Sequence, residues 1–297
     1  MDSAAVSAQI KIESVIYATD FSSCSEHAGQ YAALFARQFG ADMLAAHAYV
    51  PSQAAMEVEA EAGPGGNSAQ RKDLNAALAA AAQRFGAGAR STAGRLLEGD
   101  PKVQIPLLAR EKAPSMIVLG TQGRGRVGRG LMGSTAEGIL RSADTPSLTV
   151  GPFVPDLAPE TQPIRQVLYA TPLVPAVAQG AAYAVGVAKA FHACLDVLHV
   201  VHSDEMRSES TLSQIRTQFH AALAGVLPQH AEELCNPREL IEAGRAHERI
   251  LEHLREFKVN LLVLLLHKTS HVWLQERLSS AFHIIAHAPC PVMTITA

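Results

Sequence analysis

Short apolar runs alternate with longer segments of helical periodicity through the first half of the chain. One run, Val15-Ile16-Tyr17-Ala18, has the length and composition of a buried strand. Segment 25–39 then repeats its apolar residues at helical spacing and precedes Gly40, a typical helix C-terminal residue. This alternation predicts an α/β fold, a parallel sheet with helices on both faces. The expected strands are 15–18, 43–48, 91–98, 115–119 and 147–150, and the expected helices are 25–39, 69–85, 101–110 and 134–142.

The second half of the chain repeats the first. Residues 15–49 align without a gap on residues 167–201, with 10 identities in 35 positions. Residues 99–150 align, again without a gap, on residues 244–295. The two offsets are 152 and 145, so a difference of seven residues falls between the two aligned regions. A repeat of this length predicts two copies of one domain.

Two segments have the composition of a loop or a linker. The polar, glycine-rich stretch 61–68 is typical of a surface loop and accounts for the change of offset. Residues 152–163 carry four prolines, as a semi-rigid linker would. We therefore expect a first domain at 11–151 and a second at 164–297.

Composition places the chain among ordinary globular proteins. Its 297 residues are 48% hydrophobic and 18% charged, and the net charge of −3 gives no wide basic surface for nucleic acid. The longest aliphatic run, 261–266, is far shorter than the roughly 20 residues that span a bilayer. Residues 1–10 lack the features of a signal peptide, and the four cysteines form no C-x-x-C pair. We expect a cytoplasmic protein that binds neither nucleic acid nor membrane.

The strongest candidate for chemistry is the loop 120–135, which follows the fourth expected strand and leads into a helix. It contains six glycines, which let a backbone approach a ligand closely and take positive φ angles. A helix N-terminus offers free N–H groups to a phosphate. A flexible solvated loop is the alternative interpretation. The polar side chains that could assist binding are Arg124, Arg126, Arg129, Ser134 and Thr135.

Shorter motifs in the same loop are less specific. Gly123-x-Gly125-x-x-Gly128 fits a dinucleotide fingerprint, but it does not open the first βα unit and has no acidic residue about 20 positions later. The chain has no G-x-x-x-x-G-K-[ST], which argues against a P-loop NTPase. Gly120-x-x-Gly123 is too short to indicate an RNA-clamping loop.

A longer pattern, Gly120-x2-Gly123-x9-Gly133-Ser134, resembles the nucleotide-binding signature G-x2-G-x9-G-[ST] of the universal stress protein family. Segment 16–22 resembles that family's first strand and the acidic turn after it. Together with the repeat, the resemblance covers nearly the whole chain and implies a tandem two-domain member. It also implies five-stranded sheets of order 3-2-1-4-5 and binding of ATP.

The resemblance assigns roles by position. Asp20 would contact the adenosine, with Ala18 and Thr19 lining it and the backbone of Ala48 near the adenine. Magnesium would help by bridging the phosphates. These residues follow different strands, whose carboxyl ends meet where parallel sheets bind ligands. An isolated Asp20 could instead be a turn former. The full expected set is Ala18, Thr19, Asp20, Ala48, Leu119, Gly120, Gln122, Gly123, Gly133, Ser134 and Thr135.

The second copy has lost this pattern. Only the serine keeps its type, so we expect the first domain alone to bind ATP. The second crevice is then either filled by side chains or a small hydrophobic pocket. The substituting residues are Pro172 for the aspartate, Leu265, Lys268 and Leu278 for the three glycines, and Ser279 for the serine.

Histidines concentrate in the second half, where 11 of the 13 lie beyond residue 190. On a helix, i,i+4 pairs face one side and could bind a metal. No cysteine or carboxylate is obviously placed to complete such a site, so we expect no metal. His47 and His199 lie at equivalent strand ends, which favours a structural role for both. The i,i+4 pairs are His267/His271 and His283/His287.

Three classes of function are compatible with the sequence. The leading one is a nucleotide-binding regulatory protein of the stress response. A slow ATP hydrolase or phosphotransferase using the same site is the alternative, and an interaction module with a vestigial site is a third. We further expect the repeats to pair within the chain through strands 147–150 and 292–295, which would protect exposed strand edges, and the chains to form a homo-oligomer such as a dimer.

Overall fold

The computed structural model describes residues 10–51, 68–123, 131–157, 164–172, 177–201, 209–224, 235, 237–266 and 272–296. The chain divides into two compact units. One is built on Lys11–Gly128 and Met132–Val150, and the other on Gly151–Ala297. Each unit is described by itself below.

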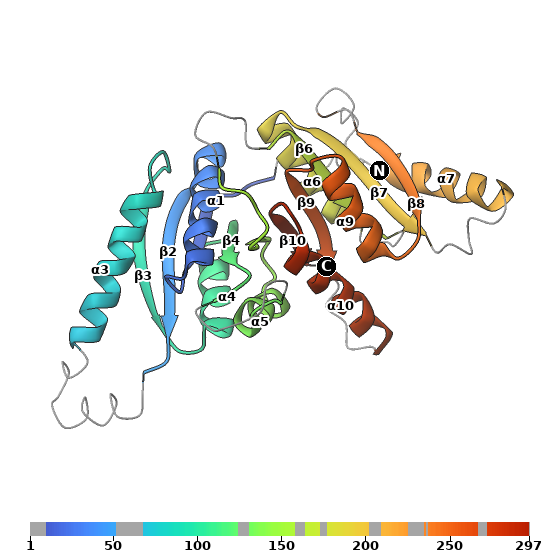
Figure 1. Cartoon of the computed structure of the whole chain (residues 1–297). Coiled ribbons are helices and arrows are strands. Elements are labelled where there is room, and N and C mark those ends of the chain that lie inside the picture. Colours follow the sequence, from blue (N-terminus) through green and yellow to red (C-terminus); the bar gives the residue numbers. More distant parts are fainter. Residues whose placement is uncertain are drawn as a thin grey trace, which may run out of the picture. The chain divides into compact units, whose positions relative to one another are not determined.

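The first unit is a five-stranded parallel sheet of order β3-β2-β1-β4-β5 (Figure 1). Helices α1 and α3 pack together on one face, and α4 and α5 pack together on the other. The predicted fold class and strand order are confirmed. The strands are β1 (Ser14–Ala18), β2 (Asp42–Tyr49), β3 (Thr92–Glu98), β4 (Ser115–Gly120) and β5 (Ser147–Val150), and the helices are α1 (Ser23–Phe39), α3 (Ser68–Phe85), α4 (Pro101–Glu111) and α5 (Ser134–Ser142).

Helix α1 illustrates why the sequence adopts these elements. Ser22 precedes it, and the Ser22 side chain accepts a hydrogen bond from the N–H of Ser25. Tyr31 and Phe35, one helical turn apart, are both buried against the sheet. Gly40 ends the helix with a φ of 59°, in the left-handed region that glycine adopts without strain.

The central strands explain the unbroken apolar runs in the sequence. All five residues of β1 are buried, as are five of the six residues of β4. A strand in the middle of a parallel sheet is covered by helices on both faces, so neither face favours polar side chains. The carboxyl ends of β1 and β4, which are neighbours in the sheet, therefore bring their following loops together.

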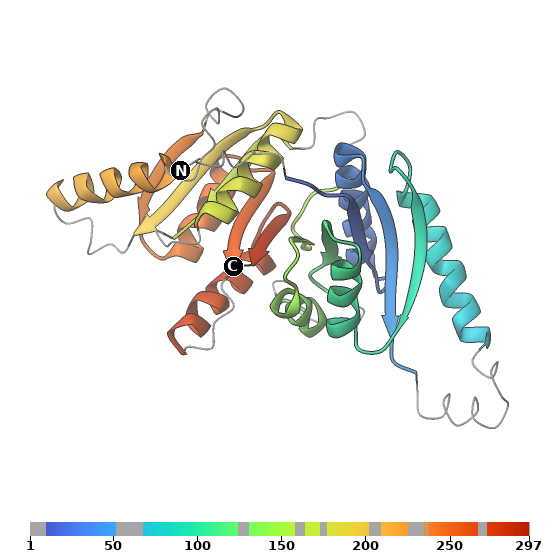
Figure 2. The ribbon, with the colours of Figure 1, turned by 180° about the vertical axis from the view of Figure 1, so that it is seen from behind.

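The second unit repeats this arrangement with strand order β8-β7-β6-β9-β10. Figure 2 shows its helices and strands from behind. Tyr169 in β6 is fully buried, like its counterpart Tyr17 in β1. The strands are β6 (Gln166–Ala170), β7 (Cys194–Val201), β8 (Arg238–Ala243), β9 (Leu261–Leu266) and β10 (Val292–Thr296), and the helices are α6 (Val177–Phe191), α7 (Glu209–Ala224), α9 (Ala246–Glu256) and α10 (Val272–His287).

Several sequence predictions concern residues that the structure does not describe. They are most of the loop 61–68, the end of the linker 152–163, and Arg124, Arg126, Arg129, His267, His271 and Lys268. Among the described residues, none of the helices combines the length and apolar character needed to cross a membrane.

Candidate functional site

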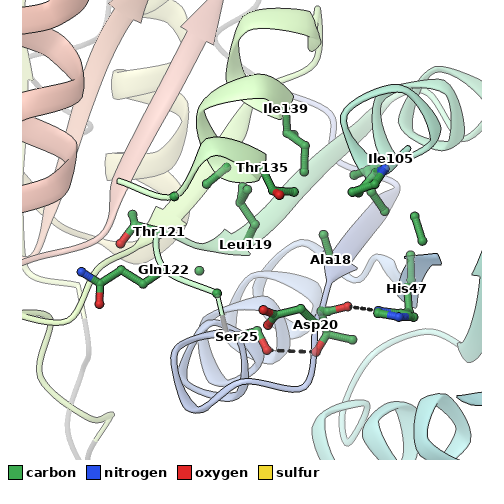
Figure 3. A pocket seen from close by; sticks show the side chains of 18 of the residues that line it. Ala18, Asp20, Ser25, His47, Ile105, Leu119, Thr121, Gln122, Thr135 and Ile139 are labelled. Carbon is green, nitrogen blue, oxygen red and sulfur yellow. Dashed lines mark hydrogen bonds between the residues drawn. The ribbon is translucent and has the colours of Figure 1, made fainter. Parts of the chain in front are cut away.

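A cavity of about 320 Å³ opens at the carboxyl ends of β1, β2 and β4 in the first domain (Figure 3). That volume lies in the range of small-molecule sites. All eleven residues expected from the sequence line this one cavity. The lining also includes residues that the sequence analysis did not select: Ser25, Ala46, His47, Pro101, Ile105, Thr121, Ala136 and Ile139.

The acidic turn after β1 is held by hydrogen bonds between its own residues. The Asp20 Oδ1 atom accepts from the backbone N–H of Ser22 at 3.1 Å and from the Ser22 hydroxyl at 2.6 Å. Phe21 has a φ of 60°, and its N–H donates to the Thr19 hydroxyl at 3.0 Å. The Thr19 hydroxyl also lies 3.0 Å from the Ser25 hydroxyl. The turn therefore fixes the Asp20 carboxylate at the mouth of the cavity.

A histidine from the neighbouring strand supports the same turn. His47 Nδ1 donates to the carbonyl oxygen of Thr19 at 2.7 Å, and its ring packs on Phe21 with centroids 4.9 Å apart. The second domain has the same bond, from His199 Nδ1 to the carbonyl of Thr171 at 3.0 Å. The second domain lacks the acidic residue yet keeps this hydrogen bond. The bond therefore holds the backbone at the end of the strand and does not depend on the acidic residue.

Two of the signature glycines have steric roles that the structure makes specific. A Cβ atom at Gly123 would lie 2.8 Å from Asp20 Oδ2, closer than van der Waals contact allows. A Cβ atom at Gly120 would lie 2.9 Å from the backbone of Cys24 in α1. Gly120 is therefore required for packing against the helix. The positive φ angles considered for this loop are not found at Gly120, Gly123 or Gly133.

The N-terminus of α5 faces the cavity without a capping side chain among the described residues. Gly133 occupies the N-cap position, with φ −69° and ψ 143°, and within the described ranges no side-chain cap hydrogen bond is made there. The Gly133 N–H donates to the carbonyl of Thr121 at 2.8 Å, which closes the base of the loop. Ser134 and Thr135 line the cavity at the start of the helix. Free N–H groups at such a terminus attract an anion.

The opposite wall of the cavity is apolar. Ile105 from α4, Leu119 from β4 and Ile139 from α5 form this wall, away from Asp20 (Figure 3). Ala46 and Ala48 on β2 leave space between the strand and α4. Asp20 is the one charged side chain among the described residues that line the cavity. The site thus combines an apolar slot, a carboxylate and a helix N-terminus.

The equivalent region of the second domain is built from larger side chains. Leu198, which is fully buried, stands at the position of Ala46, and Leu265, 9% exposed, stands at that of Gly120. Pro172 replaces Asp20, and its carbonyl accepts a hydrogen bond from the Thr171 hydroxyl. Leu198 and Leu265 are apolar and larger than their first-domain counterparts, and the expectation that the second crevice is either filled or a small hydrophobic pocket stays a prediction. The side chains of Leu278 and Ser279, and residue Lys268, lie outside the described part.

Three described histidines of the second domain, His247, His283 and His287, make ring contacts with one another. The rings of His283 and His287 are 4.2 Å apart, and His287 Nδ1 donates to the carbonyl of His283. The ring of His247 meets His283 edge-on at 5.2 Å. Within the ranges that the structure describes, no group of three or more histidine, cysteine or carboxylate side chains is arranged to hold a metal.

Three cavity residues that were not predicted could have been found from the period of their helix or strand. Ile105 is one turn after Pro101, and Ile139 is one turn after Thr135 on the same face of α5. Ala46 shares its strand face with Ala48, because alternate residues of a strand point to the same side. Each could have been found by extending the helix or strand period from an already selected residue.

The fold and the site together define a tandem α/β protein with a cavity at the switch point of its first sheet. The model of the universal stress protein family matches residues 11–151 and 163–296, nearly the whole chain. The chain therefore belongs to the universal stress protein family, as a two-domain member. No protein with a curated function matches it.

Solved structures with both domains share this architecture. A universal stress protein from Archaeoglobus fulgidus DSM 4304 has a TM-score of 0.74 at 19% identity, covering 97% of this chain and 99% of that chain. A protein of unknown function from Pseudomonas aeruginosa PAO1 has a TM-score of 0.62 at 13% identity, covering 96% and 92%. A single-domain universal stress protein, solved in complex with cAMP, matches 48% of this chain and 98% of its own length at 27% identity, with a TM-score of 0.37.

Proposed function

We propose that the first domain binds ATP and that nucleotide occupancy regulates this protein in a stress response. The observation that carries the proposal is the convergence of Asp20, the signature glycines and the uncapped N-terminus of α5 on one cavity. These groups come from distant parts of the sequence. Their meeting matches the three chemically different parts of a nucleotide.

Each part of ATP has a suitable partner. The adenine fits the apolar slot between β2 and α4, where Ala46 and Ala48 leave room for a planar base. The ribose hydroxyls can donate to the carboxylate of Asp20. The phosphates lie at the start of α5, where Ser134, Thr135 and the backbone N–H groups donate to them. A divalent cation such as Mg²⁺ would bind to the phosphate oxygens of the nucleotide.

The second domain keeps its core but takes no nucleotide in this way. Leu198 and Leu265 occupy the space that the base and the glycine turn need in the first domain. Pro172 offers no acceptor side chain for a ribose. We therefore propose one nucleotide per chain.

A regulatory role is favoured over catalysis. Phosphoryl transfer needs a positioned metal and an oriented nucleophile near the terminal phosphate. Asp20 lies at the adenosine end of the proposed site, and its Oδ1 atom already accepts two hydrogen bonds from Ser22. Slow hydrolysis or phosphotransfer at the same site is the alternative activity.

Assembly and location complete the proposal. We propose that β5 and β10 pair within the chain, that chains associate further into a homo-oligomer, and that the protein works in the cytoplasm. Edge pairing would satisfy backbone groups that an open sheet edge leaves to water.

Identification of the carried ligand tests the nucleotide directly. Purified full-length protein is heat-denatured, and the released small molecules are identified by mass spectrometry. Adenine nucleotide is expected from the wild type and not from Asp20→Asn prepared in parallel. Wild-type protein that carries none and fails to take up added ATP would contradict the proposal.

A further inference from the structure

The second domain holds a cluster of charged side chains where the first domain has leucines. Leu44 on β2, Leu97 on β3 and Leu108 on α4 pack in the first domain's core. Strand register and the repeat place Asp196, Glu242 and His253 at the three equivalent positions of β7, β8 and α9. The helix and the sheet are therefore joined by leucines in the first domain and by a triad of two carboxylates and an imidazole in the second.

Asp196 and His253 are fully buried and Glu242 is partly buried, with its side chain 21% exposed. The His253 side chain is 1% exposed, and its Nδ1 atom donates to Glu242 Oε1 at 2.9 Å. Its Nε2 atom lies 3.5 Å from Asp196 Oδ2, and the Asp196 side chain is 2% exposed. His253 therefore joins α9 to two different strands of the sheet.

Arginines complete the charge balance around the triad. Arg238 on β8 donates two hydrogen bonds to Asp196, at 2.9 and 2.7 Å. Arg249 on α9 pairs with Glu242 at 3.0 Å and also with Glu252. With His253 protonated, three cations face three carboxylates. Without that proton, the carboxylates exceed the cations by one.

We propose that protonated His253 fastens α9 to the sheet of the second domain and that loss of its proton loosens this helix. An imidazolium has an N–H for each carboxylate: Nδ1 makes a charge-assisted hydrogen bond with Glu242, and Nε2, at 3.5 Å, makes an ion pair with Asp196. A neutral imidazole keeps one N–H and leaves the other carboxylate buried against a nitrogen lone pair. The proposal concerns the second domain and does not depend on nucleotide binding in the first.

The pKa values of the triad agree with this geometry. Burial by itself would lower the pKa of His253, but the carboxylates of Asp196 and Glu242 outweigh burial and raise the pKa above its usual 6.5. Burial would raise the pKa of Asp196, but its interactions with His253 and Arg238 outweigh burial and lower that pKa. Both shifts favour the charged forms of His253 and Asp196.

The direction of the pH effect follows from linkage. Because the folded pKa of His253 is raised, its contribution to stability is complete below pH 6.5 and is lost as the pH rises through the folded pKa. Within that pH window, the equilibrium constant for local opening of α9 rises by at most about tenfold per pH unit.

Helix α9 also carries titratable groups outside the triad. His247 of α9 meets His283 of α10, and Glu248 lies 4.0 Å from His247. Burial, His287 and His247 lower the pKa of His283 below its usual 6.5, so His283 loses its proton at lower pH than His253.

Hydrogen exchange on the full chain tests the proposal, with α4 as an internal control. Exchange of α9 amides (246–256) and α4 amides (101–111) is measured by mass spectrometry from pH 6 to 9 and corrected for intrinsic rates. Protection of α9 should fall as the pH rises above 6.5, while that of α4, which docks through leucines, stays constant. A constant ratio of α9 to α4 protection would overturn the proposal.

Two variants separate the triad from a general alkaline effect. Glu242→Gln removes a charge that raises the pKa of His253, so the window narrows and the total fall in α9 protection becomes smaller. Asp196→Leu/Glu242→Leu/His253→Leu copies the first domain and should abolish the fall. A fall of unchanged size in Glu242→Gln would overturn the proposal even if the triple variant did not fold.

Discussion

Gly123 lies directly against the carboxylate of Asp20, so closely that a Cβ atom on Gly123 would be 2.8 Å from Asp20 Oδ2. The two residues are about 100 positions apart in sequence and follow different strands. The glycine loop and the acidic turn are thus fitted to each other, and a single methyl group is enough to disturb the fit.

Gly123→Ala should weaken ATP binding about tenfold or more, because the methyl group displaces the carboxylate from the mouth of the cavity. Calorimetry on nucleotide-free protein measures the change. Gly138→Ala is the matched control, since its Cβ would meet only the flexible side chain of Lys102. Equal losses in both variants would show that the contact with Asp20 is not the cause.

Asp20→Asn should reduce ATP affinity by about tenfold to a hundredfold, the usual value of a hydrogen bond to a charged group. The amide oxygen can still accept from Ser22, so the turn and the melting temperature should change little. Asp144→Asn, on the surface and paired with Arg110, is the control for loss of a charge. Affinity unchanged in Asp20→Asn would remove Asp20 from the site.

Ala46→Leu combined with Ala48→Val copies the second domain and should abolish ATP binding by filling the slot between β2 and α4. Overpacking of this kind costs about 1–3 kcal/mol in stability, so the variant should still fold. Circular dichroism checks the fold and calorimetry the binding. Retained binding would place the base elsewhere.

Gly133→Leu should abolish binding, whereas Arg126→Ala should only weaken it. A Cβ atom at Gly133 already lies 3.3 Å from the carbonyl of Thr121, and the branched side chain would extend from the start of α5 where we place the phosphates. Arg126 would contribute a charge screened by salt. Equal losses in the two variants, measured at the same ionic strength, would contradict the steric argument.

Much of the fold could be predicted because the repeat and the alternation of periods are strong signals. The expected helix 134–142 has the same bounds as α5, and Gly40 ends α1 as its position predicted. All the residues taken from the signature line one cavity. The sequence suggested only that its glycines allow close approach of a ligand or a positive φ, whereas the structure shows what each glycine contacts. The packing of Gly120 on Cys24 depends on how α1 crosses β4, which no local pattern reveals.

The charged triad of the second domain could not be predicted from the sequence alone. Asp196, Glu242 and His253 are polar residues in elements that were recognised as repeats, yet no motif links them. Their meaning appears only when strand register places them opposite the first domain's leucines. Pairs distant in sequence and without a shared signature need the tertiary structure to be recognised.

The stoichiometry of ATP binding tests the central claim most directly. Nucleotide-free full-length protein is titrated with ATP and Mg²⁺ in a calorimeter, with Asp20→Asn and Ala46→Leu/Ala48→Val measured alongside. The account predicts one ATP per chain for the wild type and strongly reduced binding in both first-domain variants. Two ATP per chain, or no binding by folded nucleotide-free protein, would contradict it.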